Sequence, residues 1–125
     1  MPTILLVADD DWVRNDVEAA LAGPGTLIET LSDPRLAVNT SHDLSPDLVI
    51  VDMQVGSMGG MAVVRALKGA AGTEVIDDAP IVLLLDRGAD IFLGKRSGAD
   101  AWVQKPFSAQ ELRAAKDEAM AGVAG

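Results

Sequence analysis

Short apolar runs alternate with stretches of helical periodicity along the whole chain, and this alternation constrains the fold more than any other feature. The runs are continuous instead of switching between apolar and polar residues, which is typical of strands buried on both faces of a parallel sheet. They cover residues 4–7, 26–30, 48–52, 81–85 and 101–104, the second being partly polar as expected of an edge strand. Strict alternation with short loops predicts one α/β domain: a parallel, doubly wound sheet of five strands with helices on both faces.

The stretches between these runs carry apolar side chains at the spacing of amphipathic helices. We expect helices at about residues 11–21, 34–38, 61–68, 89–96 and 109–119. Asp11 is the expected N-cap of the first helix, and Asp33 before Pro34 suits the start of the second. Ser108 caps the last helix, where Glu111 three residues later completes a capping box. The domain should span residues 1–120, with a frayed tail at 121–125.

The composition excludes several kinds of function. The formal net charge of −9 argues against direct binding to nucleic acid, whose phosphates would be repelled. The chain has no cysteine and one histidine, so thiolate and multi-histidine metal sites are excluded, and a metal would have to be a hard cation on oxygen ligands. We expect no signal sequence, because residues 1–3 lead directly into a strand pattern, and no apolar run approaches the roughly 18 residues of a membrane span. We therefore expect a cytoplasmic protein with no membrane partner.

Charged side chains follow three strands of the expected sheet: Asp9 follows the first, Asp52 ends the third and Lys105 follows the fifth. In the strand order 2-1-3-4-5, the first and third strands flank the crevice where ligands bind. Asp9 and Asp52 would then repel each other, by about 4 kcal/mol at about 4 Å with an effective dielectric of about 20. A divalent cation relieves that repulsion, and oxygen ligands favour Mg²⁺. Carboxylates, Mg²⁺ and a lysine together suit the acceptance of a phosphoryl group, with one carboxylate attacking.

Four segments of the chain, in order and suitably separated, resemble the receiver domain of bacterial two-component response regulators. They are residues 4–10, 47–53, 80–83 and 98–107, of which the last is the most specific. The resemblance implies a flavodoxin-like receiver fold with Asp52 as the phosphoacceptor. It also implies Mg²⁺ bound by Asp9, Asp52 and the backbone carbonyl of Gln54, and a phosphoryl group paired with Lys105. The peptide bond between Lys105 and Pro106 would be cis.

The same resemblance implies the partners of a stand-alone receiver without an output domain. A histidine kinase or a phosphotransfer protein would donate the phosphoryl group. A downstream protein would bind the face formed by the fourth helix, the fifth strand and the last helix. The domain would not be an enzyme, beyond self-catalysed phosphoryl transfer and autodephosphorylation.

The acidic pair and the loop after Asp52 depart from the family pattern. Ala8 replaces the first acid of the pair, so that only the second, Asp9, is acidic, and we expect weaker metal binding. Asp10 points elsewhere and is at most an outer-shell acid. The proline that the family carries in the loop after the acceptor is replaced by Gly56, which should make the loop more flexible.

The switch of the family is altered more severely. Leu85 stands where receivers carry a threonine or serine whose hydroxyl binds the phosphoryl group, and no serine or threonine occurs between positions 73 and 97. Asp86 follows where a small residue is usual and would repel a phosphoryl group. Trp102 keeps the aromatic position of the switch. These departures leave open a receiver-like interaction module that works without phosphorylation. An enzyme or nucleotide binder on a similar sheet is a third reading, but it lacks a glycine-rich fingerprint.

Overall fold

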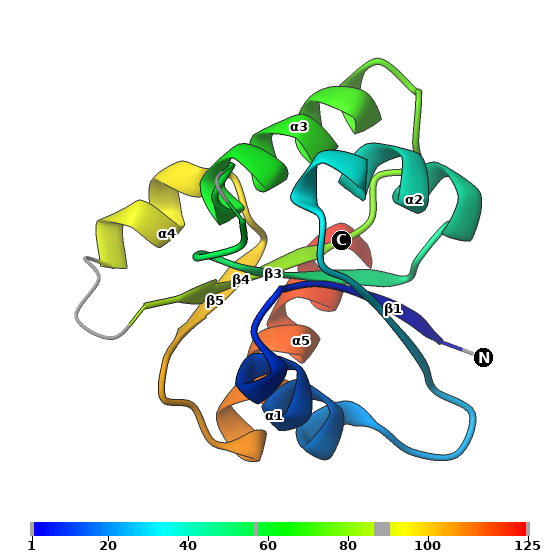
Figure 1. Ribbon diagram of the computed structural model, residues 1–125. Helices are drawn as coiled ribbons and strands as arrows, with labels where there is room; N and C mark the ends of the chain where they lie inside the picture. The colour runs from blue at the N-terminus through cyan, green and yellow to red at the C-terminus, as the bar shows by residue number, and fades with distance from the viewer. Residues whose placement is uncertain (1, 57, 87–90, 125) are drawn as a thin grey trace.

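A parallel sheet with the strand order β2-β1-β3-β4-β5 forms the centre of the molecule, as the sequence predicted (Figure 1). The computed structural model describes residues 2–56, 58–86 and 91–124. Along the chain the elements are β1 (Thr3–Val7), α1 (Asp11–Leu21), β2 (Leu27–Leu31), the 3-10 helix η1 (Pro34–Leu36), α2 (Ala37–Leu44), β3 (Leu48–Asp52), α3 (Gly60–Gly72), β4 (Ile81–Leu85), α4 (Ile91–Ser97), β5 (Ala101–Gln104) and α5 (Ala109–Ala124).

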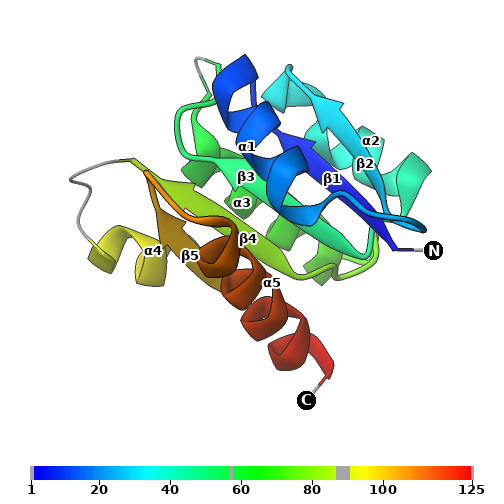
Figure 2. The ribbon, with the colours of Figure 1, turned by 90° about the horizontal axis from the view of Figure 1, so that it is seen from below.

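Helices cover both faces of the sheet. Helices α1 and α5 lie on one face and α2, α3 and α4 on the other, as Figures 1 and 2 show from two directions. Neighbouring residues of β1 supply two separate cores: Ile4 and Leu6 pack with α1 and α5, whereas Leu5 and Val7 pack with α2 and α3. Because successive side chains of a strand point to opposite faces, a strand covered on both faces needs apolar residues at every position. This explains the continuous apolar runs.

Capping side chains fix where the helices begin. The expected N-cap at Asp11 is wrong: Asp10 caps α1, with its Oδ1 accepting a hydrogen bond from the backbone N–H of Trp12 at 2.9 Å. Asp10 has extended backbone angles, as an N-cap requires, while Asp11 is already the first helical residue. At the last helix, Ser108 and Glu111 exchange two hydrogen bonds of 3.0 Å, which confirms the capping box.

Several helix boundaries differ from those expected, including the end of α3, which lies at Gly72 and not near residue 68. The second helical region is a 3-10 turn capped by Asp33, followed by a separate α-helix that continues to Leu44. The last helix continues to Ala124 instead of ending near Ala119, because this stretch has no proline and is rich in alanine, the strongest helix former. The expected first residues of the fourth helix, 89 and 90, lie outside the described residues. None of the described helices is long and apolar enough to cross a membrane.

Candidate functional site

The carboxyl ends of β1, β3 and β5 bring together the residues that sequence reasoning singled out. The pairing of Val7 with Val51 aligns the ends of β1 and β3, and the Lys105 backbone N–H donates to the Leu85 carbonyl at 2.8 Å just beyond β4 and β5. All the strands are parallel, so their carboxyl ends meet at one edge of the sheet. This edge of an open α/β sheet is where ligands usually bind.

Asp52 and Lys105 form an ion pair at the centre of this edge. The Lys105 Nζ lies 2.5 Å from Oδ1 of Asp52, which also accepts a hydrogen bond from the Gln54 N–H at 3.2 Å. Asp52 is only 1% exposed and is the one charged residue that the described part of the chain buries. The Lys105–Pro106 peptide bond is cis, as expected. Burying an ionised carboxylate costs free energy unless the charge is paired, and the ion pair with Lys105 offsets that cost for Asp52.

A second carboxylate, that of Asp86, contacts the same lysine. Its Oδ1 lies 3.2 Å from the Lys105 Nζ, so the ammonium group lies between two acids. Burial by itself lowers the pKa of Lys105, but the hydrogen bonds and charges of Asp52 and then Asp86 raise this pKa above its ordinary value. Sequence reasoning placed Asp86 near the site but did not predict this ion pair. No periodicity or spacing signals a contact that depends on the path of the chain after β4.

The carboxylates of Asp9 and Asp10 bind different backbone N–H groups. Oδ2 of Asp9 accepts a hydrogen bond of 2.8 Å from the Gly56 N–H and so joins the end of β1 to the loop after β3. The carboxylate of Asp10 is used in capping α1. Ala8 is buried and packs in the apolar cluster beneath α1 and α5. Of the acidic run after β1, Asp9 is therefore the residue that faces the loop carrying Gln54.

The loop between β3 and α3 passes so close to the site that it needs a glycine. A Cβ atom on Gly60 would collide with the backbone carbonyl of Asp52 and lie 2.7 Å from the Cα of Met53. The Gly60 N–H donates to the Met53 carbonyl at 2.9 Å, which holds the start of α3 against the end of β3. Sequence reasoning interpreted the glycines of this loop as flexibility, whereas Gly60 allows close backbone packing.

The residues expected to hold a hard cation are Asp9, Asp52 and, through its backbone carbonyl, Gln54. Oxygen donors of this kind match the preference of Mg²⁺ for a few protein oxygens and several waters. Within residues 2–56, 58–86 and 91–124, no group of three or more acidic, histidine or cysteine side chains is placed to hold a metal ion. The expected set contains two carboxylates, because Ala8 stands where the family carries a further acid.

At the switch position, apolar packing replaces hydrogen bonding. Leu85 is 1% exposed and belongs to the apolar cluster beneath α2 and α3. Trp102 packs against the same cluster, and its ring lies so close to α4 that a Cβ on Gly94 would be 2.7 Å from the ring carbon Cγ. Leu85 has no hydroxyl, and the Trp102 ring is fitted closely against a helix. Both side chains therefore lie in apolar packing at this end of the sheet.

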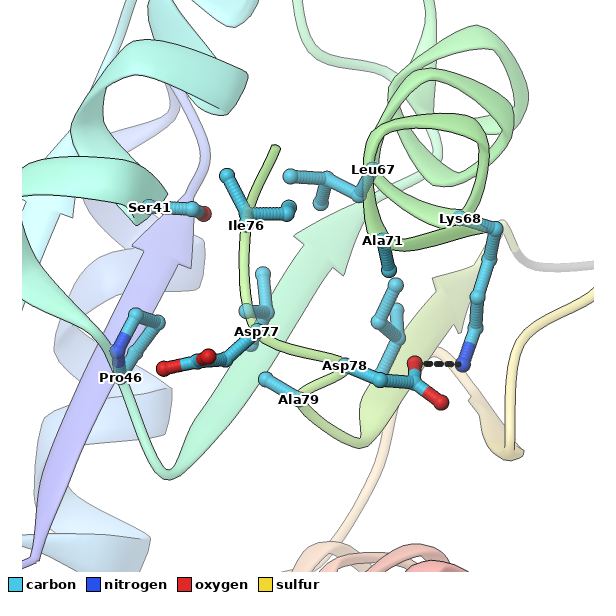
Figure 3. A pocket seen from close by; sticks show the side chains of 11 residues that line it. Ser41, Pro46, Leu67, Lys68, Ala71, Ile76, Asp77, Asp78 and Ala79 are labelled. Atoms are coloured by element: carbon cyan, nitrogen blue, oxygen red, sulfur yellow. Dashed lines mark hydrogen bonds and ion pairs between the residues drawn. The ribbon is translucent and has the colours of Figure 1, made fainter. Parts of the chain in front are cut away.

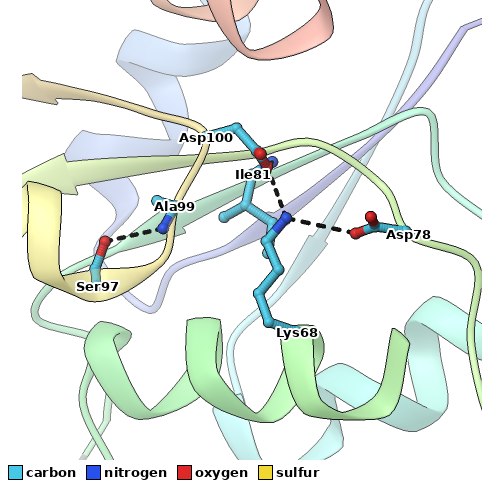
Figure 4. A network of polar contacts seen from close by, with 6 residues as sticks. All are labelled: Lys68, Asp78, Ile81, Ser97, Ala99 and Asp100. Carbon is cyan, nitrogen blue, oxygen red and sulfur yellow. Dashed lines mark hydrogen bonds and ion pairs between the residues drawn. The ribbon is translucent and has the colours of Figure 1, made fainter. Parts of the chain in front are cut away.

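A similar cluster of one lysine and two aspartates lies at the opposite edge of the sheet. Lys68 of α3 contacts Asp100 at 2.9 Å and Asp78 at 3.4 Å, and Asp100 also accepts the backbone N–H of Ile81 at 2.8 Å (Figure 4). Because Ile81 begins β4 and Asp100 precedes β5, this cluster joins α3 to the amino ends of two strands. Sequence reasoning missed it, since a helix lysine and a turn aspartate separated by 32 positions carry no shared signal.

A small cavity lies beside this second cluster, between α2, α3 and the loop before β4 (Figure 3). Its volume is about 10 Å³, which suffices for about one water molecule. Ser41 lines it, and its buried Oγ has no hydrogen-bond partner within the described residues. The cavity is too small for a substrate.

Sheet order, helix layers and the acidic edge together define a receiver-type α/β domain. The family model for the response regulator receiver domain matches residues 4–117 of this sequence, and the chain belongs to this family. The DNA-binding response regulator MtrA of Mycolicibacterium smegmatis is 35% identical over 111 residues, which cover 87% of this chain and 46% of that protein. The transcriptional regulatory protein AfsQ1 of Streptomyces coelicolor is 32% identical, covering 91% of this chain and 49% of that protein. The chain thus spans about half the length of these relatives.

Solved structures agree with this assignment. A putative response regulator from Chloroflexus aurantiacus is 27% identical and superposes with a TM-score of 0.83, covering 97% of this chain and 99% of that one. The chemotaxis protein CheY4 of Vibrio cholerae is 26% identical with a TM-score of 0.78, covering 95% and 98% of the two chains. Both share the flavodoxin-like receiver fold that the sequence predicted.

Proposed function

We propose that this domain acts in phosphorelay signalling as a receiver that accepts a phosphoryl group on Asp52 from a histidine kinase or a phosphotransfer protein. The observation that carries the proposal is the buried ion pair between Asp52 and Lys105 at the carboxyl edge of the sheet. A carboxylate at a ligand-binding edge, held by an ammonium group, is suited to attack phosphorus. Family membership supports the same role.

In the proposed reaction, an oxygen of the Asp52 carboxylate forms a bond to phosphorus. The phosphorus–nitrogen bond of a phosphohistidine breaks at the same time, and its electron pair leaves with the imidazole nitrogen. Both described hydrogen bonds to Asp52 are accepted by Oδ1, so Oδ2 is the oxygen that we assign to attack. Lys105 stabilises the negative charge on the transferred group. The domain contributes a nucleophile and charge stabilisation, and we do not propose turnover of a separate substrate.

The proposed cofactor is Mg²⁺, held by Asp9, Asp52 and the backbone carbonyl of Gln54. When bound, it would screen the charge of the incoming phosphoryl group. We expect weak affinity, because two carboxylates supply the charge. The Gly56 N–H donates a hydrogen bond to Oδ2 of Asp9 and holds that carboxylate against the loop after β3.

Output is proposed to occur by protein contact in the cytoplasm, through the face of α4, β5 and α5. Phe92 on α4 is 57% exposed, with the Lys95 ammonium 5.5 Å from its ring centroid. A large aromatic side chain that stays half in solvent is suited to a protein interface. The net charge of −9 makes nucleic acid an unfavourable direct partner for this domain.

A second candidate function is that of an interaction module that binds its partner without phosphorylation. The observation that favours it is the apolar packing of Leu85 and Trp102, which leaves no hydroxyl to report the modification of Asp52. In this case the contact face would be the same, but the signal would come from elsewhere.

Incubation with Mg²⁺ and acetyl phosphate or phosphoramidate, followed by intact mass measurement, tests the first function. We expect an adduct of about 80 Da, the mass of one phosphoryl group, that is absent in Asp52→Asn. No adduct with either donor or with a phosphorylated phosphotransfer protein would overturn it. If the adduct forms, amide resonances around Trp102 distinguish the two candidates: small shifts support the interaction module, and large shifts contradict it.

A further inference from the structure

The Lys105 ammonium group has two carboxylate partners, and one of them has no place in the proposed chemistry. Lys105 is 12% exposed in its side chain, Asp52 is 2% exposed and Asp86 is 26% exposed. Asp86 is the residue directly after β4, and its backbone carbonyl accepts a hydrogen bond of 3.4 Å from the side chain of Gln104, next to Lys105. The pair is therefore formed between the ends of two neighbouring strands.

We propose that Asp86 is a positioning residue that competes with the phosphoryl group for Lys105 and so slows the phosphorylation of Asp52. The inference rests on the proposed function, because it concerns the rate of the same reaction. A lysine has three N–H donors, of which Asp52 and Asp86 occupy two in the unmodified protein. To bind the new phosphoryl oxygens at full strength, Lys105 has to leave Asp86 or share its charge with it.

Two further features make this competition effective. Phosphorylation increases the negative charge on Asp52, and the Asp86 carboxylate stays beside the same ammonium group, so one cation has to balance more negative charge than before. Leu85 has no hydroxyl to take over part of the binding to the phosphoryl group. The pair is also partly buried, so solvent and salt screen it less than an exposed pair.

Asp86 could slow the reaction through Lys105 or by repelling the phosphodonor directly, and the distances favour the first. The Lys105 Nζ is 3.2 Å from Oδ1 of Asp86, so the two groups are in direct contact. A charge that is neutralised by a neighbouring ammonium group repels a third group less than a bare charge does. The main effect of Asp86 is therefore on the availability of Lys105.

The test measures the rate of labelling by acetyl phosphate with Mg²⁺ in three variants. Asp86→Asn keeps the shape of the side chain and removes its charge, and we expect labelling to become roughly ten-fold faster, as for the loss of a partly buried ion pair. Asp86→Glu keeps the charge and should label within about two-fold of the wild type. Asp78→Asn removes an acid from Lys68 at the other edge of the sheet and should leave the rate unchanged.

A double-mutant cycle shows whether Asp86 acts through Lys105. In a Lys105→Met background, Asp86→Asn should accelerate labelling clearly less than it does in the presence of Lys105, even though Asp86 is then an unneutralised charge. An acceleration at least as large in that background would show direct repulsion and overturn the inference, as would equal rates for the wild type and Asp86→Asn. Absence of labelling in every variant, including Asp86→Asn, would overturn the proposed function and this inference together. Labelling of Asp86→Asn but not of the wild type would support the inhibition by Asp86 and would contradict phosphorylation of the wild-type domain by these donors. Because the expected result is a gain in rate, loss of folding cannot imitate it.

Discussion

The two edges of the sheet carry similar clusters of charged side chains with different consequences. Each has a lysine between two aspartates: Lys105 with Asp52 and Asp86 at the carboxyl edge, and Lys68 with Asp78 and Asp100 at the amino edge. At the amino edge, Asp100 also accepts a backbone N–H from β4. Its carboxylate therefore joins a helix, a turn and a strand.

The carboxyl edge differs in burial and in what its acids are bonded to. Asp52 is 2% exposed in its side chain, whereas Asp78 is 66% exposed. The shorter of the two described hydrogen bonds to Asp52 comes from the side chain of Lys105. The other, from the backbone N–H of Gln54, is 3.2 Å long. The same residue types thus form a structural clamp where a strand N–H also binds the carboxylate, and the proposed reactive site where a carboxylate is buried beside a lysine. Helix α3 connects the two, with Gly60 near one edge and Lys68 near the other.

The largest effect is expected where α3 approaches the reactive edge. Gly60→Ala places a methyl group against the Asp52 carbonyl and the Met53 Cα, so the backbone has to move, and we expect a loss of about 3 kcal/mol in unfolding free energy. Gly69→Ala, near the other end of α3, meets no atom within 4 Å and should stabilise by about 0.5 to 1 kcal/mol. Urea unfolding followed by circular dichroism measures both. Equal stabilities would show that the close approach at Gly60 is wrong.

Replacing each lysine by methionine separates the two clusters by function. Lys105→Met should slow the labelling of Asp52 roughly 100-fold, the usual cost of removing one group that stabilises charge in a transition state. Lys68→Met should leave the labelling rate within about two-fold, because its partners lie at the other edge of the sheet. Labelling time courses by intact mass provide the comparison. A similar loss in both variants would mean that the two edges are coupled through α3.

The amino-edge clamp should matter for stability and not for labelling. Asp100→Ala leaves the Ile81 N–H without its acceptor and the Lys68 ammonium with Asp78 as its remaining carboxylate partner, so we expect a loss of about 2 kcal/mol, moderated by the partial exposure of the site. The labelling rate of the folded variant should equal that of the wild type. Thermal unfolding and labelling of the same sample check both parts. A variant that is as stable as the wild type would contradict the clamp.

The smallest effect is a pH dependence specific to Lys105. Burial lowers the pKa of Lys105, but Asp52 and Asp86 together raise this pKa by more than burial lowers it. The pKa of Lys105 therefore lies above its value in the unfolded chain. The resulting stabilisation is fully present below the unfolded-state pKa of about 10.4 and is lost as the pH rises through the folded-state pKa. Above about pH 10 the unfolding free energy of the wild type should fall more than that of Lys105→Met, and the difference between the two losses should be less than about 1 kcal/mol. Urea titrations between pH 8 and pH 11, with EDTA present, measure the difference, and Lys68→Met controls for the loss of a lysine.

The sequence was sufficient for the fold and for the main residues of the site. Strands 48–52, 81–85 and 101–104 have the predicted bounds, because continuous apolar runs between turns leave little freedom in where a buried strand begins or ends. The meeting of Asp52 and Lys105 followed from the strand order, since parallel strands end at one edge. Their chemical roles remain predictions for the labelling experiments.

Contacts that depend on loop paths or on single backbone angles could not be predicted. Asp10 instead of Asp11 caps α1 because the cap is decided by where helical backbone angles begin. The pairs of Asp86 with Lys105 and of Asp100 with Lys68 depend on how turns lead into and out of strands. The sequence pattern records which residues face the core, but it does not record these three-dimensional placements.

The packing of Trp102 against Gly94 gives the domain a built-in optical probe. The chain has two tryptophans and no tyrosine, and Trp12 at the start of α1 is 50% exposed. In Trp12→Phe, near-ultraviolet emission would come from Trp102 alone, which belongs to β5 and whose ring lies against Gly94 of α4. The wavelength and anisotropy of that emission would report the packing of α4 against the sheet in real time, so binding at the proposed face of α4, β5 and α5 could be measured without an attached dye.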